Sequence, residues 1–586
     1  MTRRPGAMHV ARVRSRHVDK AGQAREYESV LLRRTFRDGG KVRHQTLGNL
    51  SHLPAEVIEL VERSLRGEPF VPVDTVVALG RGLPHGHVAA VWAQAASLGL
   101  PALLGPPGRH RDLALALIVS RVLAPASKLA TVGGWADTTL GADLDVAGAS
   151  TDEVYAAMDW LLARQGTIEA GLARRHLAAT VNPDGMALFD LSSSWMEGSR
   201  CPLAARGYSR DGKKGKLQIE YGLLTDPAGR PVAVRVFSGN TADPAAFVEA
   251  VEIVREKFGL AELVMVGDRG MITSARIAAL RELGGTGWLT ALRAPQIAAL
   301  AAEDGPLQMT LFDTQDLAEI SHPDYPGERL IACRNPLLAA ERARKRAELL
   351  VATETLLAPI IAAVAAGRLS GADQIGLRVG KVINKYKMGK HLEVAITDTT
   401  LAITRRQARI DAEAALDGVY VLRTSVPADR LDAPGVVLAY KNLAQVERDF
   451  RTIKTDDLDL RPIHHRLEDR VRAHVLICML AAYLVWHLRR AWAELTYTDE
   501  HPPARTNPVS PAVRSAAAAA KAAHHHNTAG QPLHSFRGLL AHLATLTRVQ
   551  VQFPGTDTDI PMLTEATPTQ RRAFELINSP IPLTLR

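Results

Sequence analysis

Two short apolar runs that each end in an aspartate constrain the fold of this chain more than any other feature. Met186–Phe189 leads into Asp190, and Leu263–Gly267 leads into Asp268. Acids at the carboxyl ends of strands point into the cleft above a sheet, which is where α/β folds bind their ligands. The two runs therefore predict strands that carry their carboxylates to one cleft.

A third acid, Glu447, lies on a stretch with the periodicity of an amphipathic helix, Tyr440–Lys454. The predicted apolar face consists of Leu443, Val446, Phe450 and Ile453, and the second stripe of Tyr440, Glu447, Arg451 and Lys454. A solvated helix with i,i+4 ion pairs is the ordinary interpretation of such a stripe. The two acid-ended strands upstream favour a functional one.

The elements around the two aspartates follow a recognisable order. Strands are predicted at Leu217–Leu224 and Val232–Phe237, next to the Asp190 strand, and a further strand at Trp288–Leu292. Helices are predicted at Ala245–Phe258 and Ser274–Leu283. Three antiparallel strands, then helix, strand, helix and strand, match the order of a ribonuclease-H-like α/β core. We expect a mixed five-stranded sheet with helices.

The length of 586 residues predicts several domains, because single cores rarely exceed about 300 residues. The predicted segments are a small basic N-terminal module (1–75), a helical domain (76–180), a first core segment (181–295), an α+β insertion (296–416), a second core segment with the Glu447 helix (417–490) and a C-terminal helical appendage (491–586). Within the insertion we expect strand-like pieces at Leu330–Cys333, Ile375–Ile383 and His391–Ile396, and a long helix over Pro336–Leu369.

Composition narrows the class of protein. The formal net charge of +9 favours a polyanionic partner. The three cysteines, Cys201, Cys333 and Cys478, form no CxxC pair, which argues against a zinc knuckle or a disulfide framework and fits a reducing cytoplasm. The longest apolar run, Val475–Trp486, is too short to span a bilayer. We expect a soluble cytoplasmic protein.

Two basic clusters are candidate DNA contacts. Gly207–Gly215 resembles a phosphate loop, but Lys214 stands where Ser or Thr would hold magnesium. We therefore interpret Arg210, Lys213 and Lys214 as a basic loop near a polyanion. The second cluster, with Lys385 and Lys387, surrounds Tyr386 in the insertion.

Three carboxylates in one cleft repel one another unless cations neutralise them. Oxygen ligands select hard cations, so Asp190, Asp268 and Glu447 predict a site for two Mg²⁺ (or Mn²⁺) ions that supports in-line phosphoryl transfer. Lys454 would lie near a backbone phosphate, Arg451 beside it, and Tyr440 would help to hold the DNA strand.

The chain resembles the DDE transposases of bacterial insertion sequences, in the superfamily with a Tyr-x2-Arg-x3-Glu-x6-Lys signature. Tyr440, Glu447 and Lys454 match that signature, whereas Leu443 stands at its arginine position, for which Arg451 is a substitute. The resemblance also extends to Leu188–Asp190, Gly207–Asp211, Gly239–Thr241, Gly267–Gly270 and Arg461–His465.

The resemblance implies a ribonuclease-H-like domain with an insertion before the Glu447 helix. It implies cut-and-paste transposition, binding of terminal inverted repeats and target DNA, a synaptic homodimer, and association with the nucleoid when bound to DNA. It also implies a flipped base, for which Trp288 or Tyr386 is the candidate stacking partner. Two alternatives stay open: a domesticated DNA-binding protein without catalysis, and a ribonuclease-H-like nuclease without strand transfer.

Overall fold

The computed structural model of the chain describes residues 7–18, 20, 23–70, 77–241, 251, 258, 263–553 and 559–585. The chain divides into two compact units. The smaller unit holds Met1–Gly82 and Val549–Met562, and the larger unit holds Leu83–Arg548 and Leu563–Arg586. The finer division into six segments stays a prediction.

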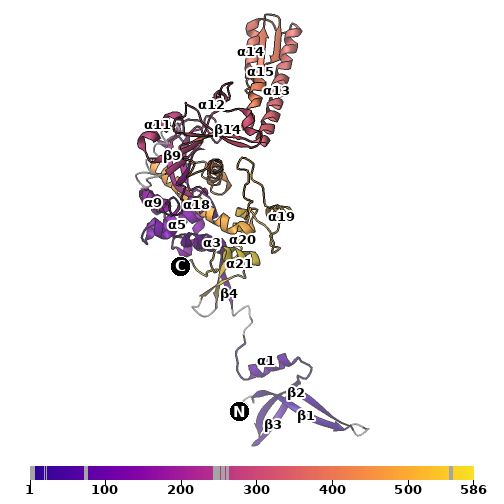
Figure 1. The fold of residues 1–586 in the computed structure, drawn as a ribbon. Helices are drawn as coiled ribbons and strands as arrows, with labels where there is room; N and C mark the ends of the chain where they lie inside the picture. Colours follow the sequence, from indigo (N-terminus) through magenta and orange to yellow (C-terminus); the bar gives the residue numbers. More distant parts are fainter. Residues whose placement is uncertain are drawn as a thin grey trace. The chain divides into compact units, whose positions relative to one another are not determined.

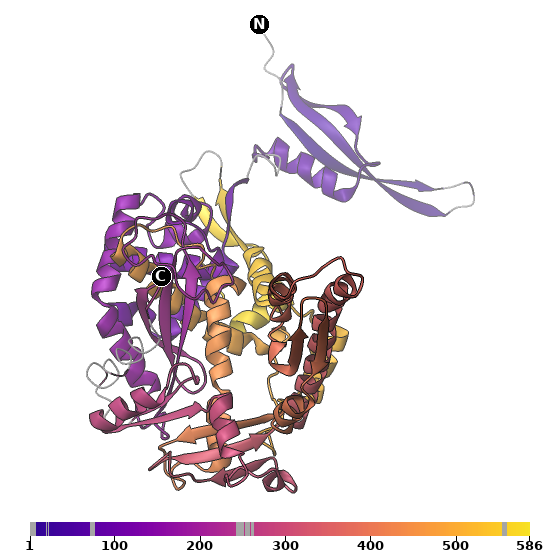
Figure 2. The ribbon, with the colours of Figure 1, turned by 90° about the horizontal axis from the view of Figure 1, so that it is seen from above.

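The smaller unit begins with an antiparallel sheet that carries one helix (Figure 2). Strands β1 (Met8–Val18), β2 (Ala24–Asp38) and β3 (Lys41–Asn49) pair in sequence order, and α1 (Ala55–Leu65) contacts β1. Buried Val30 and Ile58 supply the small apolar core. This part of the chain thus folds as a three-stranded sheet with one helix.

A second small sheet joins distant stretches of the sequence. Its order is β16-β15-β4, with β4 at Ala78–Pro84, β15 at Thr547–Gln552 and β16 at Asp559–Leu563. The region predicted to be a C-terminal helical appendage (491–586) therefore also contains two strands, β15 and β16. Within β15 the side chains alternate between β-branched and long polar ones, which is the period of a strand.

Helices follow β4 in the larger unit. They are α3 (Gly86–Ser97), α4 (Leu100–Leu104), α5 (Arg109–Leu123), α6 (Lys128–Trp135), α7 (Thr139–Asp143), α8 (Thr151–Ala163) and α9 (Gln165–His176). Ser150 caps α8 through a reciprocal capping box with Glu153, which fixes the start of that helix at Thr151. Residues 113–122 of α5 are all buried, because α5 packs between α8 and the long core helix α18 (Glu468–Ala491).

A mixed sheet forms the centre of the larger unit. Its order is β10-β11-β14-β9-β8-β5-β6-β7. The strands that match the predicted core are β5 (Met186–Trp195), β6 (Gln218–Thr225), β7 (Pro231–Ser238), β8 (Leu263–Val266) and β9 (Thr286–Ala291). β5, β6 and β7 are antiparallel neighbours, whereas β8 runs parallel to both β5 and β9.

The predicted α/β class with a mixed sheet is confirmed, but the predicted number of five strands is wrong. The sheet has eight strands within the described residues, because β14 (Val419–Thr424), β11 (Arg329–Arg334) and β10 (Leu317–Ile320) extend it beyond β9. Helix α11 (Ser274–Leu283) lies between β8 and β9 as predicted. The helix predicted over Ala245–Phe258 lies outside the described residues, apart from Val251 and Phe258.

Most of the insertion between β11 and β14 is helical (Figure 1). It contains α13 (Pro336–Ala365), α14 (Ala372–Ile383), α15 (Gln407–Ala415) and the hairpin of β12 (Leu392–Ile396) with β13 (Leu401–Arg405). The prediction of a strand at Ile375–Ile383 is wrong, because buried Ile375 and Val379, four residues apart, pack as one helix face in the cluster with α13.

The stretch around Glu447 is not one continuous helix. α16 (Ala433–Lys441) ends at Asn442, α17 (Leu443–Arg451) follows, and Thr452–Asp456 form a π-helical turn. Val446, Phe450 and Ile453 are buried, as the apolar face predicts. The predicted polar stripe is wrong at its ends, since Tyr440 belongs to the preceding helix and the π turn rotates Lys454 into the protein.

By length and composition, two described helical segments are long and apolar enough to cross a membrane, α13 and Glu468–Leu495. Neither segment is a long uninterrupted apolar run, because isolated polar side chains divide both. In Glu468–Leu495, 83% of the most apolar window is buried inside the protein. That segment is the central core helix, and it contains the apolar run Val475–Trp486.

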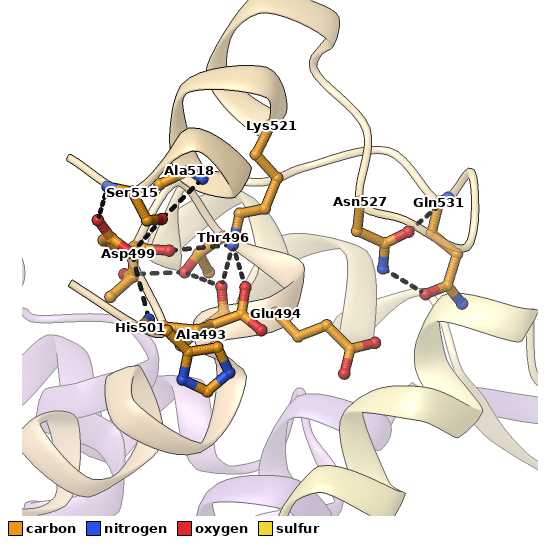
Figure 3. A network of polar contacts seen from close by, with 12 residues as sticks. Ala493, Glu494, Thr496, Asp499, His501, Ser515, Ala518, Lys521, Asn527 and Gln531 are labelled. Atoms are coloured by element: carbon orange, nitrogen blue, oxygen red, sulfur yellow. Dashed lines mark hydrogen bonds and ion pairs between the residues drawn. The ribbon is translucent and has the colours of Figure 1, made fainter. Parts of the chain in front are cut away.

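The C-terminal region of the larger unit is fixed by polar contacts (Figure 3). Lys521 on α19 (Ala516–His524) is only 8% exposed. Its Nζ donates to Ala493 O at 2.8 Å, Thr498 O at 3.0 Å and Glu500 Oε1 at 2.6 Å. The elements that follow α19 are α20 (Phe536–Ala544) and α21 (Pro568–Leu576).

Candidate active site

The register of two parallel strands brings Asp190 and Asp268 to neighbouring positions. Leu188 of β5 pairs with Val266 of β8, so each aspartate lies two residues beyond a paired position. A Cβ built on Gly267 would lie 3.6 Å from the carbonyl oxygen of Phe189, which shows how closely the two backbones approach there. The predicted convergence of the two acid-bearing strands is therefore present in the structure.

The sequence suggests that Asp190 ends its strand, but in the structure this residue lies inside β5. β5 continues to Trp195, because Leu191–Trp195 still pair with Gln218–Gly222 of β6. The parallel partner β8 stops at Val266, however, so that one side of β5 is open beside Asp190. Asp190 therefore lies where the parallel pairing of β5 with β8 ends, and on that side it is as unpaired as a residue at the end of a strand.

The surroundings of Asp190, above all its burial, act against its ionisation. The pKa of this half-buried carboxyl is raised to about 7, chiefly by burial and also by the negative charges of Asp268 and Glu447. The Leu191 N–H, 2.8 Å from Oδ1, and the Arg210 guanidinium act in the opposite direction. The three acids thus interact electrostatically, although they come from β5, the loop after β8, and α17.

Tyr440 lies beside the same three carboxylates. Burial raises the pKa of its hydroxyl to about 12, and the charges of Asp268, Asp190 and Glu447 add to this shift, while Arg269 opposes it. The hydroxyl therefore stays protonated at neutral pH and is a hydrogen-bond donor. α17, which carries Glu447, packs against β5, and α16, which carries Tyr440, packs against α17.

The acids have the donor atoms that a hard cation requires. Asp268 Oδ1 accepts the N–H groups of Gly270 and Met271, both at 2.8 Å, and Asp190 Oδ1 accepts that of Leu191. In the described structure the Oδ2 atoms and the exposed Glu447 carboxylate have no such donor. These oxygens suit Mg²⁺ or Mn²⁺. Among the described residues, however, no three potential ligands are already close enough together to hold a metal ion.

Lys454 has a partner that sequence reasoning missed. Its Nζ lies 2.9 Å from Oδ1 of Asp211, and the Arg461 guanidinium lies 2.5 Å from the same oxygen. The Asp211 side chain is only 1% exposed, and its Oδ2 accepts the Trp195 N–H at 3.3 Å. Asp211 therefore connects β5, the π turn and the loop before α18. The available signal was a single acid in an otherwise basic loop, Gly207–Gly215.

Arg210 lies close to the acids. Its N–H donates to Ser193 Oγ at 2.9 Å, and its guanidinium lies 3.6 Å from the buried Glu220 carboxylate. It also interacts electrostatically with Asp190. The loop that was predicted to be a DNA contact is thus attached to β5 and β6 at Arg210, while Lys213 and Lys214 are exposed.

The other predicted DNA contacts are exposed cations, and the two candidate stacking residues are half-buried or buried. Arg451, Lys385 and Lys387 are exposed, and Lys385 Nζ lies 5.4 Å from the centre of the half-buried Tyr386 ring. Trp288 is 4% exposed, with its Nε1 3.4 Å from Glu328, so it is too enclosed in this structure to stack on a base.

Comparisons with known proteins give two family matches. Residues 193–484 match the transposase DDE domain, and residues 16–70 match the N-terminal domain of IS1634 family transposases. Among solved structures, the chain is similar to a piggyBac transposase synaptic complex with hairpin DNA, at 9% identity and a TM-score of 0.32 over 78% of this chain and 76% of that one. No curated protein matches the chain.

Proposed function

Because the chain belongs to the DDE transposases of bacterial insertion sequences, which cleave DNA and transfer the cut strands, we propose that Asp190, Asp268 and Glu447 are its catalytic carboxylates. The observation that carries this proposal is the electrostatic coupling of the three acids at the place where the β5–β8 ladder ends. Each comes from a different element, and the charges of all three act on the Tyr440 hydroxyl.

The core that presents them is, in this proposal, ribonuclease-H-like. Its support is the strand order β7-β6-β5-β8-β9, in which three antiparallel strands are followed by two parallel ones. β14, β11 and β10 continue the sheet on the far side of β9. The chain segment between β11 and β14 is the insertion, and it precedes the helix that carries Glu447.

Enzymes of this family depend on divalent metal ions. We assign Asp190, Asp268 and Glu447 as the ligands of two Mg²⁺ or Mn²⁺ ions, which would activate the attacking water or 3′-hydroxyl and stabilise the leaving oxygen. Backbone N–H groups and one hydroxyl of the protein orient the carboxylates and the DNA. The Leu191 and Gly270 N–H groups orient two of the carboxylates, and the protonated Tyr440 hydroxyl donates to an oxygen of the DNA strand.

DNA is the substrate of this family, and the exposed cations are the proposed backbone contacts. Lys213 and Lys214 project from the loop beside Arg210, Arg451 from α17, and Lys385 and Lys387 from the insertion. Lys454 is held by Asp211 and contacts phosphate from that fixed position. We further propose cut-and-paste transposition of an element with terminal inverted repeats, by a synaptic homodimer in the cytoplasm and on the nucleoid.

The direct test replaces each acid by its amide. Asp190→Asn, Asp268→Asn and Glu447→Gln should each lower metal-dependent cleavage of a DNA end by on the order of 10³-fold or more, because a metal ligand is lost while the shape is retained. Binding of the same DNA should stay within a few fold of wild type. Joining of pre-cut ends to target DNA should be lost as well.

Asp449→Asn provides a matched control on the same helix. Asp449 is a half-buried carboxylate on the same helix as Glu447, and it interacts with Arg448, Asp226 and Arg489. Cleavage by this variant should resemble that of wild type. The assignment is wrong if any of the three amide variants cleaves at the wild-type rate.

A further inference from the structure

Lys128, at the start of α6, is a buried cation with an unusual partner. It is 6% exposed, and its Nζ lies 3.1 Å from Nδ1 of His474. No other hydrogen bond and no ion pair of Lys128 occurs within the described residues. An uncompensated charge in such a place is costly, so the side chain needs an anion or the loss of its proton.

Two other lysines with little or reduced exposure, Lys521 and Lys441, have oxygen acceptors for their Nζ atoms. Lys521 has three oxygen acceptors, two carbonyls and the Glu500 carboxylate (Figure 3). Lys441 Nζ donates to three consecutive carbonyl oxygens, those of Pro508, Val509 and Ser510. Compared with these, Lys128 lacks oxygen acceptors, which are what a bound anion would supply.

Lys128 also faces a cavity that is large enough for a ligand. The cavity has a volume of about 470 Å³ and is lined by Arg121, Pro125, Ala126, Ser127, Lys128, Leu129, Tyr155, Asp459, Arg461, Pro462, His464, His465 and His474. Its one acid, Asp459, lies 3.8 Å from Arg537. Arg461 pairs with Asp211. Within the described residues, buried Arg121 donates only to carbonyl oxygens, those of Leu458 and Ala126.

The charges in this wall are therefore mainly positive. Burial lowers the pKa of Lys128 to about 7, and the neighbouring Arg121 lowers it further, while Cys478 acts in the opposite direction. The pKa of His465 falls to about 3, chiefly because of burial and then because of Lys128. An anion bound among these groups would raise the pKa values that the neighbouring cations lower.

We propose that the cavity between α6 and the Arg461–His465 loop binds a phosphate group of the DNA backbone, with Lys128 Nζ and Arg121 facing its oxygens. This inference rests on the proposed function for its ligand. It adds a phosphate site built partly from the helical segment that precedes the catalytic core. Arg461 links this site to the active site, because it shares Asp211 with Lys454.

The test measures DNA binding in EDTA, where no cleavage occurs, with a short duplex of arbitrary sequence. Lys128→Met removes the charge and keeps the length of the side chain. Loss of one phosphate contact should weaken binding at low salt about tenfold or more and should reduce the slope of log K against log salt by about 1. Lys345→Met, at an exposed lysine of α13 paired with Glu341, removes the same charge and should change neither quantity measurably.

A second measurement on the wild-type protein does not depend on how the variant folds. Acetylation of lysines, followed by mass spectrometry, should show that duplex DNA protects Lys128 but leaves Lys345 reactive. An unchanged salt slope in Lys128→Met, or protection of Lys128 by inorganic phosphate but not by DNA, would overturn the proposal. Failure of the catalytic assignment would appear separately, as cleavage by the amide variants in the presence of metal.

Discussion

Asp211 shows how one residue fixes several functional side chains. Its almost fully buried carboxylate accepts from Lys454, from Arg461 and from the Trp195 N–H. Since Lys454 is itself buried, this ion pair is shielded from water and from salt. The lysine that the signature places near the DNA is thus a positioned group and not a freely moving one.

A double-mutant cycle tests this ion pair. Asp211→Asn should destabilise the protein by about 3 kcal/mol, because two cations lose their counter-charge, and Lys454→Met should cost less. The two changes together should be less costly than their sum, with a coupling of about 1–3 kcal/mol, measured by urea denaturation. Lys216→Met, which removes an exposed ion pair with Glu197, should change stability by less than about 1 kcal/mol. Strict additivity of the first pair would contradict the assignment.

The low pKa of buried Lys128 should make the stability of the folded protein depend on pH. In the unfolded chain a lysine keeps its proton up to its ordinary pKa of 10.5, whereas folded Lys128 releases it near pH 7. Raising the pH from about 7 towards 10.5 therefore favours the folded state at this site. The groups that act on it are Arg121, His474, His465 and Cys478.

Lys128→Met should remove this dependence. At pH 7, without DNA, the variant should be more stable than wild type by on the order of 1–3 kcal/mol, because no buried cation has to be accommodated. The difference should shrink as the pH rises towards 10.5. Thermal denaturation across this pH range measures it, and a variant that loses stability equally at every pH would contradict the interpretation.

At the scale of elements, α17 holds Glu447 in place through its apolar face. Phe450 is 5% exposed, and its ring meets that of Tyr221 on β6 edge-on at a centroid distance of 5.6 Å. Phe450→Ala should cost about 3–5 kcal/mol through the cavity it leaves, and should lower cleavage although no polar group is removed. Hydrogen exchange should locate the loosening in α17. Arg448→Ala, on the exposed face of α17, should change stability by no more than about 0.5 kcal/mol.

Periodicity predicted the elements well where one face is buried against a sheet or another helix. Val446, Phe450 and Ile453 are buried as their spacing indicates. At Ile375–Ile383 the β-branched residues favoured a strand, but contacts with α13 selected a helix. Local sequence does not contain those contacts, so it could not decide between the two structures.

The candidate site was predicted at the level of its acids but not of their supports. Asp190, Asp268 and Glu447 follow from strand and helix patterns. The π turn that rotates Lys454 towards Asp211 depends on the tertiary packing of Thr452–Asp456. The same holds for Arg210, because its approach to Asp190 depends on how the Gly207–Gly215 loop folds onto β5.

At the scale of the whole molecule, the proposed synaptic complex predicts a change of assembly on DNA. One chain has a mass of 63.4 kDa. Two chains should join two terminal-repeat duplexes, because each end must meet its own set of catalytic carboxylates. Light scattering coupled to size exclusion should show a complex with two chains and two duplexes. Cleavage of both ends by separate complexes, each of one chain with one duplex, would contradict the homodimer.

The central claim is that Asp190, Asp268 and Glu447 form one metal-binding cleft. Electron paramagnetic resonance of Mn²⁺ measures this without relying on activity, because protein-bound and free ions give different signals. Wild-type protein should bind Mn²⁺, and Asp190→Asn, Asp268→Asn and Glu447→Gln should each weaken that binding about tenfold or more, whereas Asp449→Asn should not. Unchanged Mn²⁺ binding in the three variants would contradict the account.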